Sequence, residues 1–234
     1  MGSIDDSHTQ AAQTKPLPFN LTEVDRQVLA LTDDEFVYHD WDELKDIIGR
    51  NDLGALRRAP SDLRRYIAWT DSIKSSFGGI TNYICQRRLH WTTSSNPDIA
   101  SIPWANATPF ADASDYKILR NDWPYGLTPD IAHIVVWSKT PIAAKPDTGE
   151  ATDESKALIE AFVDRTFVQR LQRDPVCEGM AKEEVRREKV LWFKNWTALQ
   201  SVRSLEHFHV LLRGVPDDLI TEWTDERRIV QELP

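Results

Sequence analysis

The spacing of apolar residues predicts a first part made of helices. Between residues 61 and 91, apolar side chains recur at steps of three and four residues, which is the period of a helix with one buried face. Gly78 and Gly79 interrupt this pattern, so we expect a kink or the close approach of another element there. Shorter helices are predicted over 22–31 and 53–58.

The best-marked helix of this first part follows Asp40. Asp40 and Glu43 have the spacing of a capping box, and Gly49 is a typical C-terminal stop. Residues 1–20 are polar and end in a proline-containing stretch, so we predict a disordered tail there. A single domain is predicted over 21–234.

The second part of the chain mixes strands with helices. Residues 116–120 and 132–138 are predicted to form strands joined by a turn-rich segment, and 206–212 shows the period-two alternation of another strand. The helices expected here are 154–172, then 182–189 with a helical continuation into 191–193, and finally 216–226. Helices that flank a few strands predict an α+β fold, with a small antiparallel sheet and a helical N-terminal part.

The composition narrows the class of protein. The 234 residues are 41% hydrophobic and 28% charged, which is enough for one domain with a full core. A formal net charge of −9 argues against nucleic-acid binding through the overall field, although it is compatible with a local basic face. No run approaches the roughly 18 apolar residues of a membrane span. The two cysteines lack metal spacing. We therefore expect a cytoplasmic protein without a membrane partner, a metal or a cofactor.

Two histidines on the last predicted strand carry the clearest chemical information. Residues two apart share a face of a strand, so His207 and His209 point to one side while Phe208 and Val210 point to the other. Two imidazoles in register suit a metal, a phosphate or general acid/base chemistry. The alternative is a pair of half-buried histidines that hydrogen-bond to neighbouring loops.

Two stretches resemble the histidine-triad proteins. Residues 116–125 followed by 133–139 are similar to that family's strand–PxxPGH–strand unit, and 195–213 is similar to its final segment of alternating histidines. In this alignment His207 takes the middle position, where the family has a phosphate-attacking nucleophile, and the first histidine position falls on Leu205. The resemblance implies histidine-triad-like strands, with nucleotide hydrolysis or transfer as one alternative function.

A second resemblance covers most of residues 35–220. The segments 121–126, 133–139 and 195–210 are similar, in this order, to the fungal N-acetylglucosamine-induced protein family. Members of that family include arginine-containing cyclodipeptide synthases, which take arginine from arginyl-tRNA, join it to a second amino acid and close the diketopiperazine. The resemblance therefore implies an aminoacyltransferase whose partners are arginyl-tRNA and an amino acid. A non-catalytic role in a sugar response is a further alternative.

That reaction sets requirements which residues in these segments can meet. An aminoacyl ester is already activated, so the enzyme needs no ATP site, but it needs a base, an oxyanion donor and a rigid pocket. The candidate catalytic residues are Glu206, His207, His209 and Ser201. The candidate substrate-binding residues are Asn121, Asp122, Trp123, Trp137, Asn195 and Trp196, of which Trp123 and Trp137 have a place in the core as their alternative.

One face of the long 61–91 helix is basic. Its arginines are Arg64, Arg65, Arg87 and Arg88. Such a run of charge is most often a solvated helix face. With a tRNA substrate, however, it gains a use as a surface that contacts phosphates.

Overall fold

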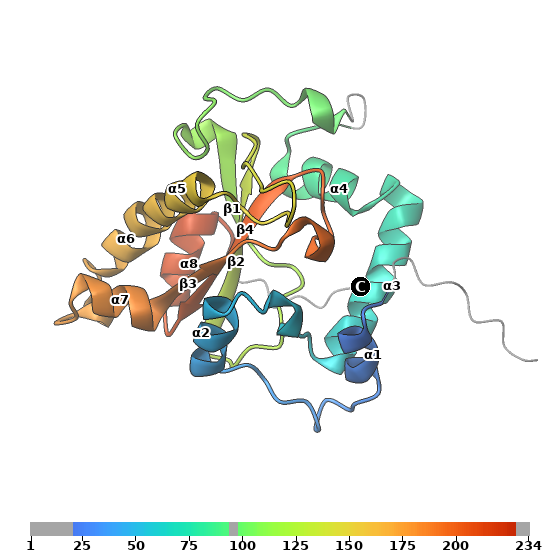
Figure 1. Cartoon of the computed structure of the whole chain (residues 1–234), viewed down its shortest axis with the longest axis horizontal. Coiled ribbons are helices and arrows are strands. Elements are labelled where there is room, and N and C mark those ends of the chain that lie inside the picture. The colour runs from blue at the N-terminus through green and yellow to red at the C-terminus, as the bar shows by residue number, and fades with distance from the viewer. Residues whose placement is uncertain (1–20, 94–97, 228–234) are drawn as a thin grey trace, which may run out of the picture.

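A four-stranded antiparallel sheet organises the part of the chain that the computed structural model describes, residues 21–93 and 98–227 (Figure 1). The strands, in the order β1-β2-β4-β3 across the sheet, are β1 (Tyr116–Arg120), β2 (Ile131–Ser138), β4 (Glu206–Arg213) and β3 (Val190–Phe193). The predicted α+β class, with a small antiparallel sheet and a helical N-terminal part, is confirmed. The predicted tail over 1–20 lies outside the described residues.

Strand β3 corrects one prediction. Helix α7 (Lys182–Lys189) does not continue through 191–193, because the chain turns into β3 at Val190. The short apolar run from Val190 to Phe193 has no period that separates a helix end from a buried strand. Pairing decides the outcome: β3 lies against β4, with Phe193 opposite His209, and so satisfies backbone groups at the sheet edge.

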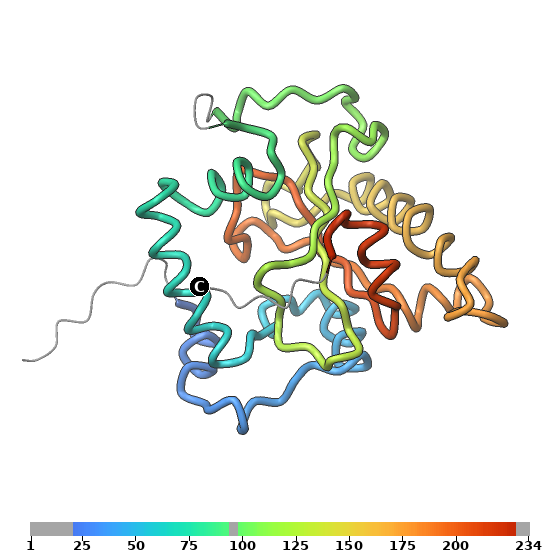
Figure 2. Tube along the Cα trace, turned by 180° about the vertical axis from the view of Figure 1, so that it is seen from behind, coloured from blue at the N-terminus to red at the C-terminus, as the bar shows by residue number. Residues whose placement is uncertain are grey.

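Helices of the second half cover one face of the sheet. They are α5 (Asp153–Val163), α6 (Gln169–Leu171), α7 and α8 (Asp217–Thr224), and a π-helical turn joins α5 to α6 within the predicted helix 154–172. Their apolar side chains and the even-numbered residues of β4, such as Phe208 and Val210, form the main core. In Figures 1 and 2, α5, α6 and α7 lie on one side of the sheet and the N-terminal helices on the other.

The opposite side of the sheet carries α1 (Glu23–Leu29), α2 (Trp41–Gly49), α3 (Pro60–Phe77) and α4 (Ile80–Tyr83). The predicted start of α2 is confirmed, because the Asp40 side chain accepts a hydrogen bond from the Glu43 amide at 2.9 Å. The predicted break is also confirmed: Gly78 and Gly79 have φ values of 76° and 152°, which separate α3 from α4.

Three small apolar clusters, rather than one continuous core, join these helices to the sheet. The first packs Ile84 and Leu89 on Trp137, and the second packs Trp41 of α2 on Leu211. The third joins α1 to α3 through Val28 and other residues. Because the clusters stand apart, space remains between them above the middle of β2 and β4.

The turn that leads into β2 passes close to the N-terminal part at Gly126. Its amide donates to the Arg57 carbonyl at 2.7 Å, and its carbonyl accepts from the His39 amide at 2.8 Å. A Cβ atom at Gly126 would collide with the buried ring of Phe36 and lie 3.2 Å from the backbone nitrogen of Ala59. A larger residue therefore cannot occupy this position unless the Phe36 ring or the turn moves.

We predict that Gly126→Ala lowers the free energy of unfolding by about 1–3 kcal/mol, the usual cost of overpacking. Urea denaturation measures this change. Gly49→Ala is the matched control, because a Cβ there meets nothing within 4 Å and alanine favours the helix. Equal stability of Gly126→Ala and the wild type would show that the Phe36 ring yields without cost.

Candidate active site

A cavity of about 140 Å³ lies over the sheet face that carries the odd-numbered residues of β4. His207 and His209 both line it, as strand alternation predicts. The other predicted site residues in its wall are Ser201, Asn121, Asp122, Trp123, Trp137, Asn195 and Arg88. Strands β2 and β4, the turn after β1 and the loop before β4 thus bring together segments that are far apart in the sequence.

Two of the predicted catalytic and substrate-binding residues lie outside this cavity. The Glu206 carboxylate pairs with Lys194 Nζ at 3.0 Å, and it does not line the cavity. Trp196 packs into the apolar cluster around α2, with Phe193 and Leu211. The structure therefore separates Glu206 from the two histidines that follow it on the strand.

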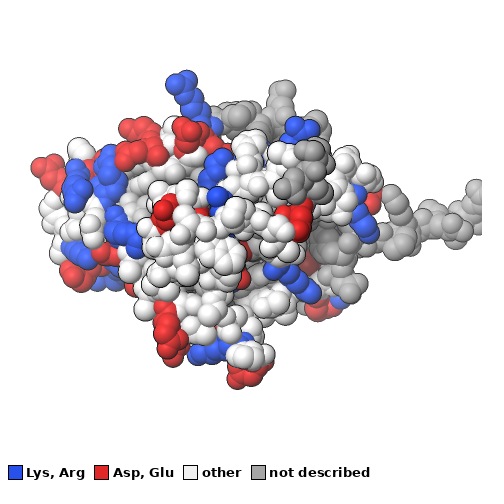
Figure 3. Space-filling model, turned by 90° about the horizontal axis from the view of Figure 1, so that it is seen from above, with Lys and Arg blue, Asp and Glu red and all other residues white. Residues whose placement is uncertain are grey.

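Three of the four predicted tRNA-binding arginines are engaged within the chain. Arg64 donates to the carbonyls of Leu29 and Leu31 beyond the end of α1, at 3.0 and 3.2 Å. Arg65 pairs with Asp62 on its own helix. Arg88 turns inward to a network described below, whereas Arg87 is exposed and lies over the Phe77 ring. Figure 3 shows Lys and Arg interspersed with Asp and Glu over the described surface seen from above.

His207 presents a lone pair to the cavity. Its Nδ1 donates to the Leu205 carbonyl at 2.9 Å, so the neutral ring has its free lone pair on Nε2. The ring is buried and stacks on Trp137, with 4.7 Å between centroids. Burial lowers the pKa of His207 to about 4, which keeps the imidazole neutral at physiological pH. His207 therefore presents an unprotonated ring nitrogen as an acceptor at physiological pH.

A chain of hydrogen bonds connects the turn after β1 to His209. The Trp123 amide donates to Asn121 Oδ1 at 2.9 Å, so the Asn121 NH₂ group faces His133, 3.3 Å from Nδ1 and 3.1 Å from Nε2. His133 Nε2 lies 2.9 Å from His209 Nδ1. The Asn121 NH₂ group is within reach of both His133 nitrogens, so these distances fit a donor at either His133 Nε2 or His209 Nδ1, and we take His133 Nε2 as the donor.

This assignment leaves His209 with its own proton on Nε2. That buried atom and Asn195 Oδ1 have no hydrogen-bond partner within the described part of the chain. Burial, followed by the nearby His133, lowers the pKa of His209 well below its ordinary value, so the ring stays neutral. An unpaired buried polar group costs about 1–3 kcal/mol, which a bound ligand can relieve. The cavity thus offers a donor at His209 and acceptors at His207 and Asn195.

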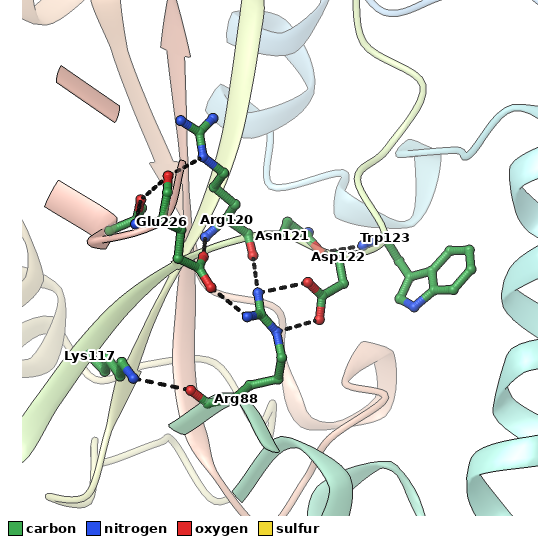
Figure 4. A network of polar contacts seen from close by, with 8 residues as sticks. Arg88, Lys117, Arg120, Asn121, Asp122, Trp123 and Glu226 are labelled. Atoms are coloured by element: carbon green, nitrogen blue, oxygen red, sulfur yellow. Dashed lines mark hydrogen bonds and ion pairs between the residues drawn. The ribbon is translucent and has the colours of Figure 1, made fainter. Parts of the chain in front are cut away.

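A network of ion pairs closes one side of the cavity (Figure 4). Arg88 makes two hydrogen bonds to Asp122, at 2.8 and 2.7 Å, and a third to Glu226 beyond α8. Glu226 also accepts from the Arg120 amide at 2.8 Å. Burial raises the pKa of Asp122, and the Arg88 guanidinium opposes that rise. Asp122, which was predicted to bind a substrate guanidinium, is thus occupied by Arg88 of its own chain.

Sequence reasoning missed His133, Arg58 and Glu226. His133 lies on β2, on the same face as Val135 and Trp137, so alternation along that strand was an available indication. Arg58 lines the cavity, with its Nε 3.2 Å from the Trp123 carbonyl, but it lies in an irregular segment without periodicity. Glu226 meets Arg88 only through the tertiary fold.

Two further observations concern a metal site and a membrane span. Among residues 21–93 and 98–227, no group of three or more His, Cys, Asp and Glu side chains is placed to hold a metal ion. Within the same residues, no helix combines the length and the apolar character needed to cross a membrane.

Fold and site together define an α+β protein with a cavity lined by neutral imidazoles on one face of an antiparallel sheet. Residues 40–213 match a family model described as "Protein of unknown function (DUF3605)", and the chain belongs to this family.

Comparisons with individual proteins support the resemblance to N-acetylglucosamine-induced proteins as distant homology. N-acetylglucosamine-induced protein 1 of Candida albicans is 29% identical over 193 residues, which cover 78% of this chain and 71% of that protein. Uncharacterized protein YPL067C of Saccharomyces cerevisiae is 28% identical over 172 residues, or 74% of this chain and 77% of that one. The crystal structure of HTC1 is similar with a TM-score of 0.52 and 26% identity, and the match covers 80% of this chain and 91% of HTC1.

The buried imidazoles make the stability depend on pH. The folded pKa is about 4 for His207 and about 3 for His133, both below the value near 6.5 of an unfolded chain. Between these values the unfolded chain binds more protons than the folded chain. The free energy of unfolding therefore falls as the pH falls from about 6.5 to 4, by up to about 1.4 kcal/mol per pH unit for each imidazole.

We predict that His207→Gln makes this dependence shallower, because one buried imidazole is removed. Urea denaturation at a series of pH values should give a slope smaller by about 1.4 kcal/mol per unit between pH 6 and 4.5. Above pH 7.5 the two slopes should agree, which provides the internal control. Parallel curves over the whole range would mean that His207 is not held neutral by burial.

Proposed function

We propose that the protein is an arginyl-tRNA-dependent aminoacyltransferase that joins arginine to a second amino acid and gives a cyclic dipeptide. The observation that carries the proposal is the pair of neutral imidazoles in one cavity, where His207 offers a lone pair and His209 offers an N–H group. The family resemblance carried by the segments 121–126, 133–139 and 195–210 points to the same reaction.

Aminolysis of an ester needs both of these groups. In the proposed step the α-amine of the second amino acid attacks the ester carbonyl carbon of arginyl-tRNA, and His207 Nε2 accepts a proton from the amine. The carbonyl oxygen becomes an oxyanion, which the His209 N–H stabilises. The ester bond then breaks, the ribose oxygen leaves with the proton that His207 returns, and an arginyl dipeptide remains. Ring closure is a second aminolysis, in which the arginine α-amine attacks the carbonyl carbon of the second residue. In this proposal the second amino acid is therefore also supplied as an aminoacyl ester, whose ribose oxygen leaves when the ring closes. Neither imidazole needs to be charged in the resting enzyme.

The wall of the cavity supports a substrate with a guanidinium group. Trp123, Tyr66 and Trp69 form an aromatic cluster, with centroid separations of 5.5 Å for Trp123–Tyr66 and 5.3 Å for Trp123–Trp69. The faces of such rings attract a guanidinium. In this proposal Asp122 acts indirectly, because its pairing with Arg88 holds the turn that presents Trp123.

The remaining predicted residues receive more limited roles. Ser201 is exposed in the cavity wall and is the candidate acyl acceptor if the arginyl group is first transferred to the enzyme. The Glu206 carboxylate pairs with Lys194, so His207 rather than Glu206 is the proposed base. Phosphate contacts of the tRNA at Arg64, Arg65, Arg87 and Arg88 stay a prediction. Among these four, Arg87 is exposed, and its guanidinium pairs with no carboxylate or backbone carbonyl of the described residues.

A second candidate is a histidine-triad-like nucleotide hydrolase or transferase. The observation in its favour is that the same neutral Nε2 of His207 can attack a phosphorus atom, with Arg58 as the nearby cation. This activity needs no tRNA. The two functions therefore differ in the substrate that gives turnover, and absence of both would favour a non-catalytic role.

The test supplies the protein with arginine, a mixture of amino acids, tRNA, arginyl-tRNA synthetase and the synthetases for the other amino acids, and measures arginine-containing diketopiperazines by mass spectrometry. We predict that His207→Ala lowers their rate of formation by about 10²-fold or more, the scale expected for loss of a general base. Glu206→Gln, one residue away, should keep most of the activity because its carboxylate lies outside the cavity. Nucleotide turnover without tRNA, and no diketopiperazine, would favour the second candidate.

A further inference from the structure

The cavity continues into a larger depression, which we call the outer groove. It has a volume of about 540 Å³ and lies between α3, the Gly78–Thr81 segment and the loop 198–203. The cavity and the outer groove share the lining residues Arg58, Tyr66, Ile80, Tyr125, Leu199 and Ser201. The two hollows therefore adjoin each other along these residues, on the path from the imidazoles to the outer groove.

The outer groove is cationic in an acidic protein. Its lining contains three cations, Arg58, Lys74 and Arg203, and one anion, Asp25, which gives 3 − 1 = +2. The whole chain has a formal net charge of −9. Asp25 is engaged with Thr22 in the capping box of α1. Lys74 and Arg203 are exposed and form no ion pair with a carboxylate of the described residues.

Arg58 lies where the cavity meets the outer groove. Its guanidinium lies 4.4 Å from the centroid of the Tyr66 ring and 5.3 Å from that of the Tyr125 ring, and it donates to the Trp123 carbonyl. No carboxylate of the described residues pairs with it. A half-buried guanidinium that is held by aromatic rings keeps donors for an external anion, and its planar donors match a phosphate or a carboxylate.

We infer that the outer groove binds the single-stranded 3′ end of the tRNA and brings the aminoacyl ester to His207. The inference rests on the proposed function and adds the path of the substrate. An ester on the terminal ribose reaches the cavity only if the last nucleotides lie in the hollow outside it, and each of them adds a negative phosphate. Cations along a groove, with aromatic rings beside them, suit a single strand. The contacts thus lie at Lys74 and Arg203, away from Arg87.

The test compares two substrates with one charge-reversal variant, Lys74→Glu/Arg203→Glu. With arginyl-tRNA, KM should rise on the order of tenfold at 0.1 M salt, and its salt dependence should flatten, because phosphate contacts are lost. With arginyl-adenosine, an ester without phosphates, the variant should equal the wild type. The control is Arg173→Glu/Arg187→Glu, which makes the same change in net charge on the α6–α7 side and should behave like the wild type.

Each outcome of this test bears on a stated claim. A wild type that forms product from neither ester would overturn the proposed function, and the groove inference with it. Product from both esters, with identical KM values for the variant and the wild type, would overturn the groove inference alone. An equal loss of activity with both esters would show that Lys74 and Arg203 shape the cavity rather than bind phosphates, and would overturn the inference. An equal rise in KM in the Arg173→Glu/Arg187→Glu control would assign the change to overall charge, and would also overturn it.

Discussion

Burial of three imidazoles on one face of β2 and β4 imposes the strictest requirement on this fold, because every ring nitrogen must find a partner or face the cavity. Antiparallel pairing sets His209 opposite Val135 and Trp137 opposite His207, which brings the rings into contact. Apolar neighbours then hold the rings from the side, with Phe193 stacked on His209 at 4.8 Å between centroids. Desolvation keeps the imidazoles neutral, so donor and acceptor roles follow from the hydrogen-bond pattern rather than from charge.

The hydrogen-bond chain that ends at His209 includes residues distant from it in the sequence. The Asn121 amide is oriented by the backbone of its own turn, and this turn is held by the pair between Asp122 and Arg88. Glu226, which follows α8, completes the network. These ion pairs are half-buried, so loss of one member leaves an uncompensated charge that is only partly solvated. The C-terminal segment thus contributes to the cavity without lining it, because it fixes the turn that orients the imidazoles.

Local sequence patterns predict those parts of the fold that depend on interactions between nearby residues. The cap of α2, the break at Gly78 and the common face of His207 and His209 all follow from residues within a few positions of one another. Strand β3 was mistaken for a helix because its identity depends on an edge of β4 that the local sequence does not contain. His133 contacts His209 across 76 residues of sequence, and Arg88 contacts Glu226 across 138, so no periodicity could pair them.

Tertiary contacts also explain why two neighbouring residues with the same predicted role differ in the structure. Arg88 and Arg87 are adjacent on the helical segment after α4, yet one guanidinium is half-buried and paired with two carboxylates, and the other is exposed. A basic helix face in a sequence therefore says little about which of its cations can meet a phosphate, since internal carboxylates compete for them. A cation held by aromatic rings, as Arg58 is, keeps its donors for a ligand. On an acidic protein, a phosphate-binding surface is therefore indicated by cations that lack an internal carboxylate partner, and not by the number of cations.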